Sequence, residues 1–151
     1  MIMGRQIKFR GYNLKSKKWL YGYYLVNRGK HYIVQDEVVD PFSEPSDFEV
    51  EPESVGQYVG RFYECNVYEG DIIEYGNRTL IKIQSDRQTY DVKFIGKVMY
   101  NEQQSLFYIK LTAPKGLDVP VSCKYPSLDL NVSYYKVIGN EYEEKLKISN
   151  P

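Results

Sequence analysis

The stretch VEPESVGQYVGRFYECNVYEGDII, residues 50–73, holds the densest run of conformational signals in the chain. Pro52 favours one tight helical turn near its start, because proline suits the first position of a helix. Two glycines follow at an interval of four residues and permit close backbone approach or positive φ. The stretch ends with the turn pair Gly70-Asp71 ahead of two isoleucines, which predicts a turn that enters a strand.

The carboxylates Glu69 and Asp71 have two interpretations. They could be paired acids of a catalytic site, or polar residues of a turn before a strand. The turn interpretation is favoured, because Gly70 supplies the backbone freedom a turn needs and an aspartate accepts hydrogen bonds from nearby turn amides. We therefore expect Gly70 to have positive φ or a close backbone contact, and Asp71 to bond its own turn.

Outside this stretch, the pattern of apolar and polar residues predicts mainly β structure. Short segments either alternate in polarity or are rich in aromatic and β-branched residues. Spacing of this kind is typical of a small barrel or sandwich. The predicted strands are residues 6–10, 18–27 with a bulge at Gly22, 31–35, 72–75, 79–84, 90–100 bent at Gly96, 106–111, 119–124 and 134–138.

The first three of these strands form a predicted β-meander, with turns at residues 13–17 and 28–30. A connector is predicted at 61–66 and a turn at 76–77. Near the end of the chain, Asn140 with a glutamate three residues later is the pattern of a capping box. A short C-terminal helix is therefore predicted.

Charge is unevenly distributed along a chain of zero net charge. Residues 1–30 hold eight Lys/Arg and no acid, whereas residues 31–75 hold twelve acids and one base. Residues 76–151 hold eleven bases and eight acids. Such asymmetry suggests that the first two segments face each other, within one molecule or between copies, or that the basic segment binds an anionic partner. A homo-oligomer is the expectation that follows.

Several functional classes lack their sequence signals. The chain has no nucleotide-binding loop and no Ca²⁺ loop spacing, and its one histidine, His31, lies in no motif. Cys65 and Cys123 are far apart, which suits free thiols in a reducing compartment. No apolar run is long enough to span a membrane, and no signal peptide is evident. We expect a cytoplasmic protein without cofactor or metal.

The basic N-terminal segment is also aromatic, and it supplies the candidate binding residues. On one interpretation it is a platform on which the bases of single-stranded nucleic acid stack. On the other it is an ordinary sheet with an aromatic core face and a solvated basic face. Sixteen tyrosines favour a binding protein over an enzyme, because tyrosine is enriched at interfaces. The candidates are Lys17, Lys18, Trp19, Tyr21, Tyr23, Arg28 and Lys30.

Four motifs occur in order along the chain: the opening IKFR with Tyr12, the central motif at residues 50–60, the strand start at 67–73 and the closing VIGNEYE at 137–143. Together they resemble the YopX-like proteins of phages and prophages. Three features depart from that family: Tyr12 replaces the usual Trp, residues 61–66 replace a D-x-N-G-K-type turn, and residues 79–125 match loosely.

The resemblance implies a small, mostly β accessory protein with a part similar to an SH3-like barrel, and it transfers no catalytic residue. The motif positions to which it assigns structural roles are Gly56, Gln57, Tyr58, Gly60, Glu69, Gly70, Asp71, Gly139 and Asn140.

We therefore expect an N-terminal β-meander part over residues 1–60 and an SH3-like part with a C-terminal helix over 61–151. The leading hypothesis is a non-catalytic module for protein interaction or self-assembly, with itself or with a phage or host protein as partner. The alternative is a nucleic-acid-binding protein that uses the basic aromatic segment. An enzyme that uses the acids around Glu69 and Asp71 is the third hypothesis.

Overall fold

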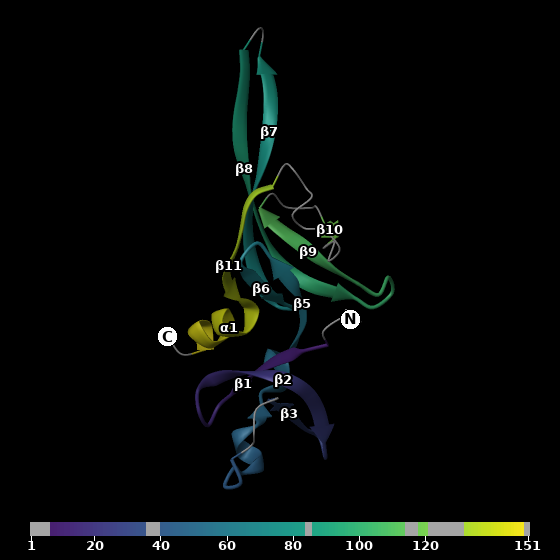
Figure 1. Cartoon of the computed structure of the whole chain (residues 1–151), viewed down its shortest axis with the longest axis vertical. Helices are drawn as coiled ribbons and strands as arrows, with labels where there is room; N and C mark the ends of the chain where they lie inside the picture. The colour runs from purple at the N-terminus through teal and green to yellow at the C-terminus, as the bar shows by residue number, and fades with distance from the viewer. Residues whose placement is uncertain (1–6, 36–39, 84–85, 114–117, 121–131, 150–151) are drawn as a thin grey trace, which may run out of the picture. The chain divides into compact units, whose positions relative to one another are not determined.

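The computed structural model describes residues 7–35, 40–83, 86–113, 118–120 and 132–149 (Figure 1). It confirms a mainly β chain with one short C-terminal helix. Two compact units are present, Met1–Tyr58 and Val59–Pro151. The elements in order are β1 Phe9–Asn13, β2 Lys18–Asn27, β3 Lys30–Val34, η1 Pro45–Asp47, β4 Glu49–Val50, η2 Pro52–Ser54, β5 Gly56–Phe62, β6 Cys65–Tyr68, β7 Asp71–Ile83, β8 Asp86–Asn101, β9 Leu106–Ala113, β10 Asp118–Pro120, β11 Val132–Asn140 and α1 Glu141–Ser149.

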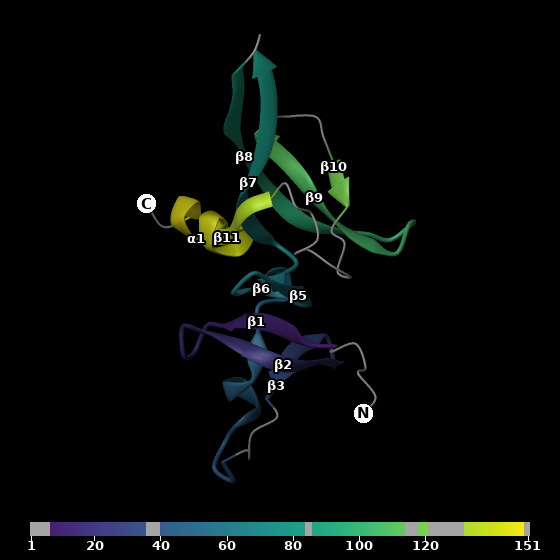
Figure 2. The ribbon, with the colours of Figure 1, turned by 45° about the horizontal axis from the view of Figure 1, so that its top comes forward.

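The first unit contains the predicted meander, with the strand order β4-β3-β2-β1 followed by the start of β5. Figure 2 shows β1, β2 and β3 side by side. The β2–β3 hairpin turns through Arg28 and Gly29, whose φ values are 49° and 75°. Positive φ at both central residues defines a type I′ turn, whose twist matches the strands it joins. The predicted turn therefore fixes the register that pairs Asn27 with Lys30.

Gly22 lies where β2 changes neighbours. Residues 18–22 of β2 pair with β1, and residues 23–27 pair with β3. The ladder with β1 ends at Gly22 and the ladder with β3 begins at Tyr23, and neither ladder has a register shift, so the bulge predicted there is wrong. A Cβ at this position would overlap the carbonyl oxygen of Val34. Glycine is thus required by close backbone approach, the other feature that an isolated glycine in a strand signals.

The central stretch begins as predicted. Pro52–Ser54 forms a 3-10 turn with proline at its start. Beyond it, Gly56 and Gln57 pair with Arg10 and Phe9 of β1, and the Tyr58 amide donates to the Lys8 carbonyl at 2.7 Å. The second half of the motif at residues 50–60 thus lies in strand β5, which extends the meander sheet beyond β1.

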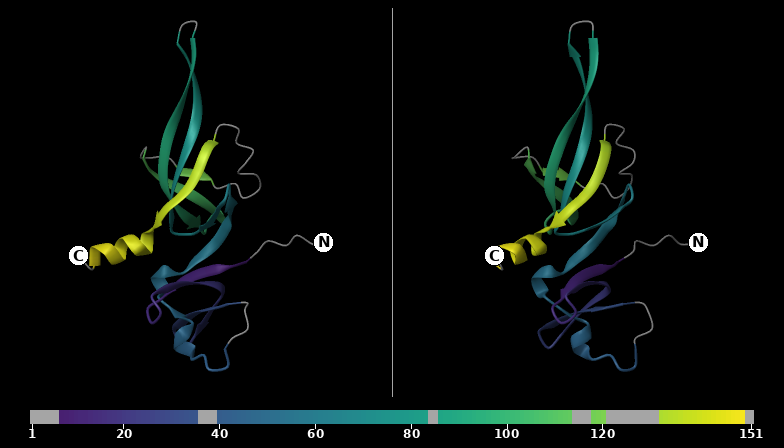
Figure 3. Two further views of the ribbon diagram at one scale, coloured as in Figure 1. Left: turned by 60° about the vertical axis from the view of Figure 1, so that its left-hand side comes forward. Right: turned by 90° about the vertical axis from the view of Figure 1, so that its left-hand side faces the viewer.

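The second unit carries a sheet with the order β10-β9-β8-β7-β11. Its long hairpin is visible in Figure 3 as a twisted teal ribbon. β7 and β8 pair without a break from Ile72↔Lys97 to Ile83↔Asp86, so the turn predicted at residues 76–77 is wrong. A continuous partner strand satisfies the backbone on both sides of Gly76-Asn77, which outweighs the local turn preference of that pair.

Two further boundaries differ from the sequence-based expectation. The connector predicted at residues 61–66 is a tight hairpin, in which β5 ends at Phe62, Tyr63 takes φ 53° and β6 begins at Cys65. The edge strand predicted at 119–124 begins at Asp118 and is described as far as Pro120, and residues 121–124 lie outside the described part of the chain. The bend predicted at Gly96 coincides with a register shift between β8 and β9.

The core of the second unit is aliphatic and aromatic. Phe62 stacks on Tyr135 with ring centroids 5.3 Å apart, and Tyr75 stacks on Phe94 at 5.0 Å. These ring contacts place aromatic side chains in and around the core of the second unit. The buried cluster consists of Val59, Phe62, Val67, Ile73, Tyr75, Val98, Phe107, Ile109 and Leu111. The SH3-like barrel that the resemblance implies stays a prediction, because the strand orders alone do not close a barrel.

The predicted C-terminal helix is confirmed, and so is its cap. The Asn140 side-chain oxygen accepts a hydrogen bond from the Glu143 amide at 2.9 Å, which satisfies one of the free N–H groups at a helix start. Helix α1 has no buried residue.

Candidate functional site

Gly70 and Asp71 form a structural turn in the second unit. Gly70 has φ 86°, which confirms the prediction of positive φ. Its amide donates to the Val98 carbonyl at 2.9 Å, and its carbonyl accepts from the Glu141 amide at 2.9 Å. Asp71 is 1% exposed, and its Oδ2 accepts from the Tyr68 amide at 2.8 Å, as predicted. The backbone of this turn thus connects β8 to the start of α1.

Four of the seven binding candidates, Lys18, Trp19, Tyr21 and Tyr23, lie on β2, and they are divided between its two faces. Side chains alternate between the faces of a strand, so Trp19, Tyr21, Tyr23 and Leu25 share one face. We call these four residues the β2 aromatic face. Lys18 lies on the opposite face, so the structure does not bring it together with the aromatic candidates.

The β2 aromatic face is exposed over most of its length. Tyr21, Tyr23 and Leu25 are exposed by 41%, 57% and 42%. Trp19 is half-buried, since it packs edge-on against Tyr12 with ring centroids 5.5 Å apart. The Arg10 guanidinium lies 4.7 Å from the Trp19 ring centroid, so one cation of the basic segment is held against an aromatic ring.

The remaining candidate cations are divided between the ends of β2. Lys17 precedes the strand with φ 56°, and Arg28 follows it in the type I′ turn. Lys30 pairs with Asn27 and so lies on the same side as the β2 aromatic face, where its ammonium contacts Glu49 at 3.2 Å. Lys17, Lys18 and Arg28 are exposed, and they make no ion pair within the described ranges.

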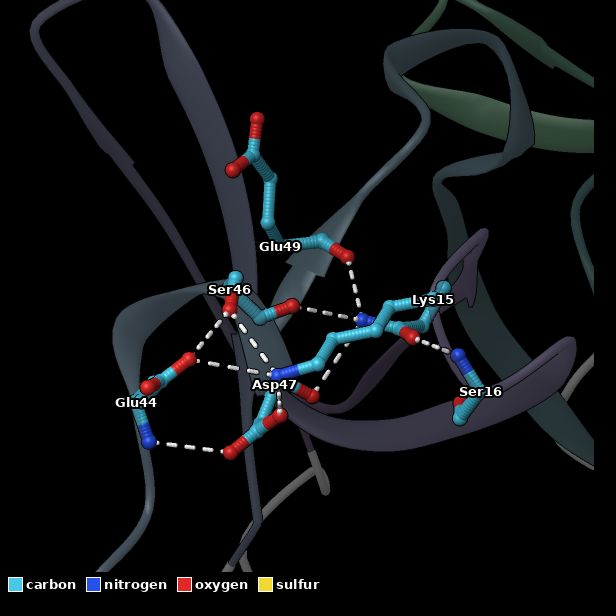
Figure 4. A network of polar contacts seen from close by, with 7 residues as sticks. Lys15, Ser16, Glu44, Ser46, Asp47 and Glu49 are labelled. Atoms are coloured by element: carbon cyan, nitrogen blue, oxygen red, sulfur yellow. Dashed lines mark hydrogen bonds and ion pairs between the residues drawn. The ribbon is translucent and has the colours of Figure 1, made fainter.

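A polar network at the β1–β2 turn joins the basic segment to the loop that contains Glu44, Ser46 and Asp47, which we call the acidic loop (Figure 4). The Lys15 ammonium contacts Asp47 at 2.6 Å and Glu44 at 3.3 Å. The hydrogen bond from Lys15 lowers the pKa of Asp47 below its ordinary value, and its reciprocal raises the pKa of Lys15. Because both groups are exposed, solvent screening limits what the pair adds to stability.

Near this ion pair, the buried side chain of Asn13 fixes the acidic loop through hydrogen bonds. This role was not predicted from the sequence. The side chain is 1% exposed. The two N–H groups of its amide are shared among three backbone carbonyls, of Ser46 at 3.0 Å, Asp47 at 3.2 Å and Glu49 at 2.8 Å. The amide oxygen accepts from the Ser16 backbone at 2.7 Å. Asparagine at a strand end is a turn signal in sequence, so its bond to the Ser16 amide could be predicted. Its bonds to the distant carbonyls could not.

The residues that the structure describes also bear on catalytic and metal-binding sites. His31 contacts the Tyr24 hydroxyl through Nδ1 at 2.6 Å and stacks on the same ring, a structural arrangement within the sheet. Within those residues, no three His, Cys, Asp or Glu side chains are grouped to hold a metal ion. No described helix has the length and apolar character needed to cross a bilayer.

The sequence was compared with families of known proteins, with curated proteins and with solved structures. The model of a family described as YopX protein matches residues 8–147. No curated protein and no solved structure matches the chain.

Proposed function

Given that this chain belongs to the YopX protein family, we propose that it is a non-catalytic binding module that recognises another protein through the β2 aromatic face and associates with copies of itself. The observation that carries the proposal is the run of three exposed large side chains, Tyr21, Tyr23 and Leu25, at alternate positions of one strand. The family resemblance supports a phage or prophage accessory role, in the cytoplasm of the bacterial host.

The chemistry of this face favours a protein over a nucleic acid. Tyrosine gives large amphipathic contact area with few rotatable bonds, and contiguous exposed apolar surface is typical of interaction sites. The cations nearest the face are engaged: Arg10 lies over Trp19, and Lys30 contacts Glu49. The carboxylate of Glu49, on the same face as the tyrosines, would repel phosphate.

Adjacent residues of β2 offer a matched test of protein binding. Leu25 and Val26 are exposed by 42% and 53%, on opposite faces. With a partner captured by the wild-type chain, Leu25→Ser and Tyr23→Ser should each lower the affinity about tenfold or more, as loss of an interface anchor does. Val26→Ser should leave the affinity unchanged. Titration calorimetry measures both, and equal losses for Leu25→Ser and Val26→Ser would contradict the proposed face.

Nucleic-acid binding is the second candidate, supported by the exposed cations Lys17, Lys18 and Arg28 at the two ends of β2. If phosphates contact these cations, affinity for any sequence falls steeply with salt. Lys17→Glu with Lys18→Glu should weaken binding to all sequences alike and reduce the salt slope by about one per lost phosphate contact. Fluorescence anisotropy with single- and double-stranded DNA and RNA measures this. The absence of binding at low salt would exclude this candidate.

A further inference from the structure

A groove in the second unit runs between α1 and the sheet. It has a volume of about 490 Å³. Its floor is largely aliphatic, with Ile72 from β7, Ile95 from β8 and Ile138 from β11. Ile138 is exposed by 47%, so part of the floor is open to solvent. In Figure 3 the yellow helix α1 leaves the end of β11 and projects from it.

The wall of the groove is one face of α1. Glu141, Glu144, Lys145 and Ile148 line it, at the i, i+3, i+4 and i+7 positions that share a helix face. Ile148 lines the groove and is nevertheless 80% exposed. A nine-residue helix is too short to be stable by itself in water. A helix with no buried residue, next to an open apolar floor, is the geometry of a surface that another molecule covers.

We propose that a second copy of this chain covers the groove, with the two α1 helices packed antiparallel about a twofold axis. This inference rests on the self-association part of the proposed function. It names a surface separate from the β2 aromatic face, which remains available to a different partner.

Charge complementarity favours a second copy as the occupant. An antiparallel pairing centred between residues 144 and 145 places Glu144 of each copy opposite Lys145 of the other. A twofold interface makes every such contact twice, so two reciprocal ion pairs form. Glu144 makes no ion pair within the described ranges, and Lys145 has only a 3.7 Å contact to Glu141. The same pairing brings Ile148 of each copy toward the start of the opposite helix, near the exposed Ile138.

The test is the mass of the protein in solution, measured by sedimentation velocity across concentration. The wild type is expected to form a dimer. Ile148→Asp should raise its dissociation constant about tenfold or more, because a charge would enter an apolar contact. Lys147→Glu is the matched control, since this exposed residue of the same helix does not line the groove. Far-UV circular dichroism checks that each variant is folded.

Charge reversal gives a sharper result. Glu144→Lys and Lys145→Glu each put like charges across the twofold axis, so each single variant alone should be largely monomeric. Mixed together, the two single variants present opposite charges at both contacts and should form a heterodimer. The double variant should again form a homodimer.

Self-association and the groove interface are contradicted by two different outcomes. A wild-type chain that stays monomeric at high micromolar concentration would contradict the proposed self-association itself. A wild-type dimer that is indifferent to Ile148→Asp and to both charge reversals would leave self-association standing and place its interface elsewhere, which overturns the groove proposal alone.

Discussion

Replacement of Asn13 by alanine is expected to lower the free energy of unfolding of the first unit by about 3 kcal/mol or more. The Asn13 side chain is buried, and its two amide N–H groups are shared among the backbone carbonyls of Ser46, Asp47 and Glu49. Removing it leaves those three carbonyls and the Ser16 amide without that hydrogen-bond partner. A buried polar group that loses its hydrogen bond costs more than the bond contributed.

The only tryptophan in the chain makes this change measurable in one unit. Trp19 lies in the first unit, so its fluorescence during urea unfolding reports on that unit. Asn101→Ala is the matched control: Asn101 accepts a turn bond from Gln104 but holds no loop across the chain, and it lies in the second unit. Asn13→Asp tests the two sets of hydrogen bonds separately. Its side chain can still accept from the Ser16 amide, but it cannot donate to the three carbonyls. If Asn13→Ala unfolds at the urea concentration of the wild type, the loop is held by other contacts.

Gly70→Val is expected to cost about 1–3 kcal/mol, the range for residues held in disfavoured backbone geometry. With φ 86° at Gly70, a β-branched side chain is strained whatever space surrounds it. Any movement that relieves the strain breaks the backbone bonds to Val98 and Glu141. Thermal melting followed by circular dichroism measures the loss in Tm.

Asp71→Asn is the companion change and should cost less than about 1 kcal/mol, since an amide oxygen can still accept from the Tyr68 amide. The pair of variants distinguishes the structural role from a catalytic one. A catalytic Asp71 predicts that the Asn variant folds normally and loses function, while Gly70→Val melts like the wild type. That combination would contradict the turn assignment.

The features predicted correctly from sequence are those decided within a few residues. The Arg28-Gly29 turn, the positive φ of Gly70 and the cap at Asn140 each depend on local backbone geometry. The turn predicted at Gly76-Asn77 is wrong because β8 pairs with that segment along its whole length. A local sequence pattern does not show which distant strand a segment pairs with. The bulge at Gly22 failed for the same reason, since the carbonyl that excludes a side chain belongs to Val34.

The candidate site shows the same limit. Sequence placed Trp19, Tyr21 and Tyr23 on one strand, and alternation put them on one face. The charge asymmetry correctly suggested contact between basic and acidic segments, which occurs within one unit at Lys15 and Lys30. The donor role of Asn13 and the groove beside α1 could not be predicted, because both are formed by residues far apart in the chain.

The pairing of β11 with β7 has a consequence for the order in which the second unit folds. β7, β8 and β9 are consecutive antiparallel strands, so each pairing closes only a short loop. β11 instead pairs with β7, from Val132↔Asn77 to Asn140↔Asp71, and must close a far longer loop at a larger entropic cost. Long-range pairings of this kind slow folding. We therefore expect the β7–β8–β9 meander to assemble first and β11 to dock late, which would bring α1 to its place at the end of folding.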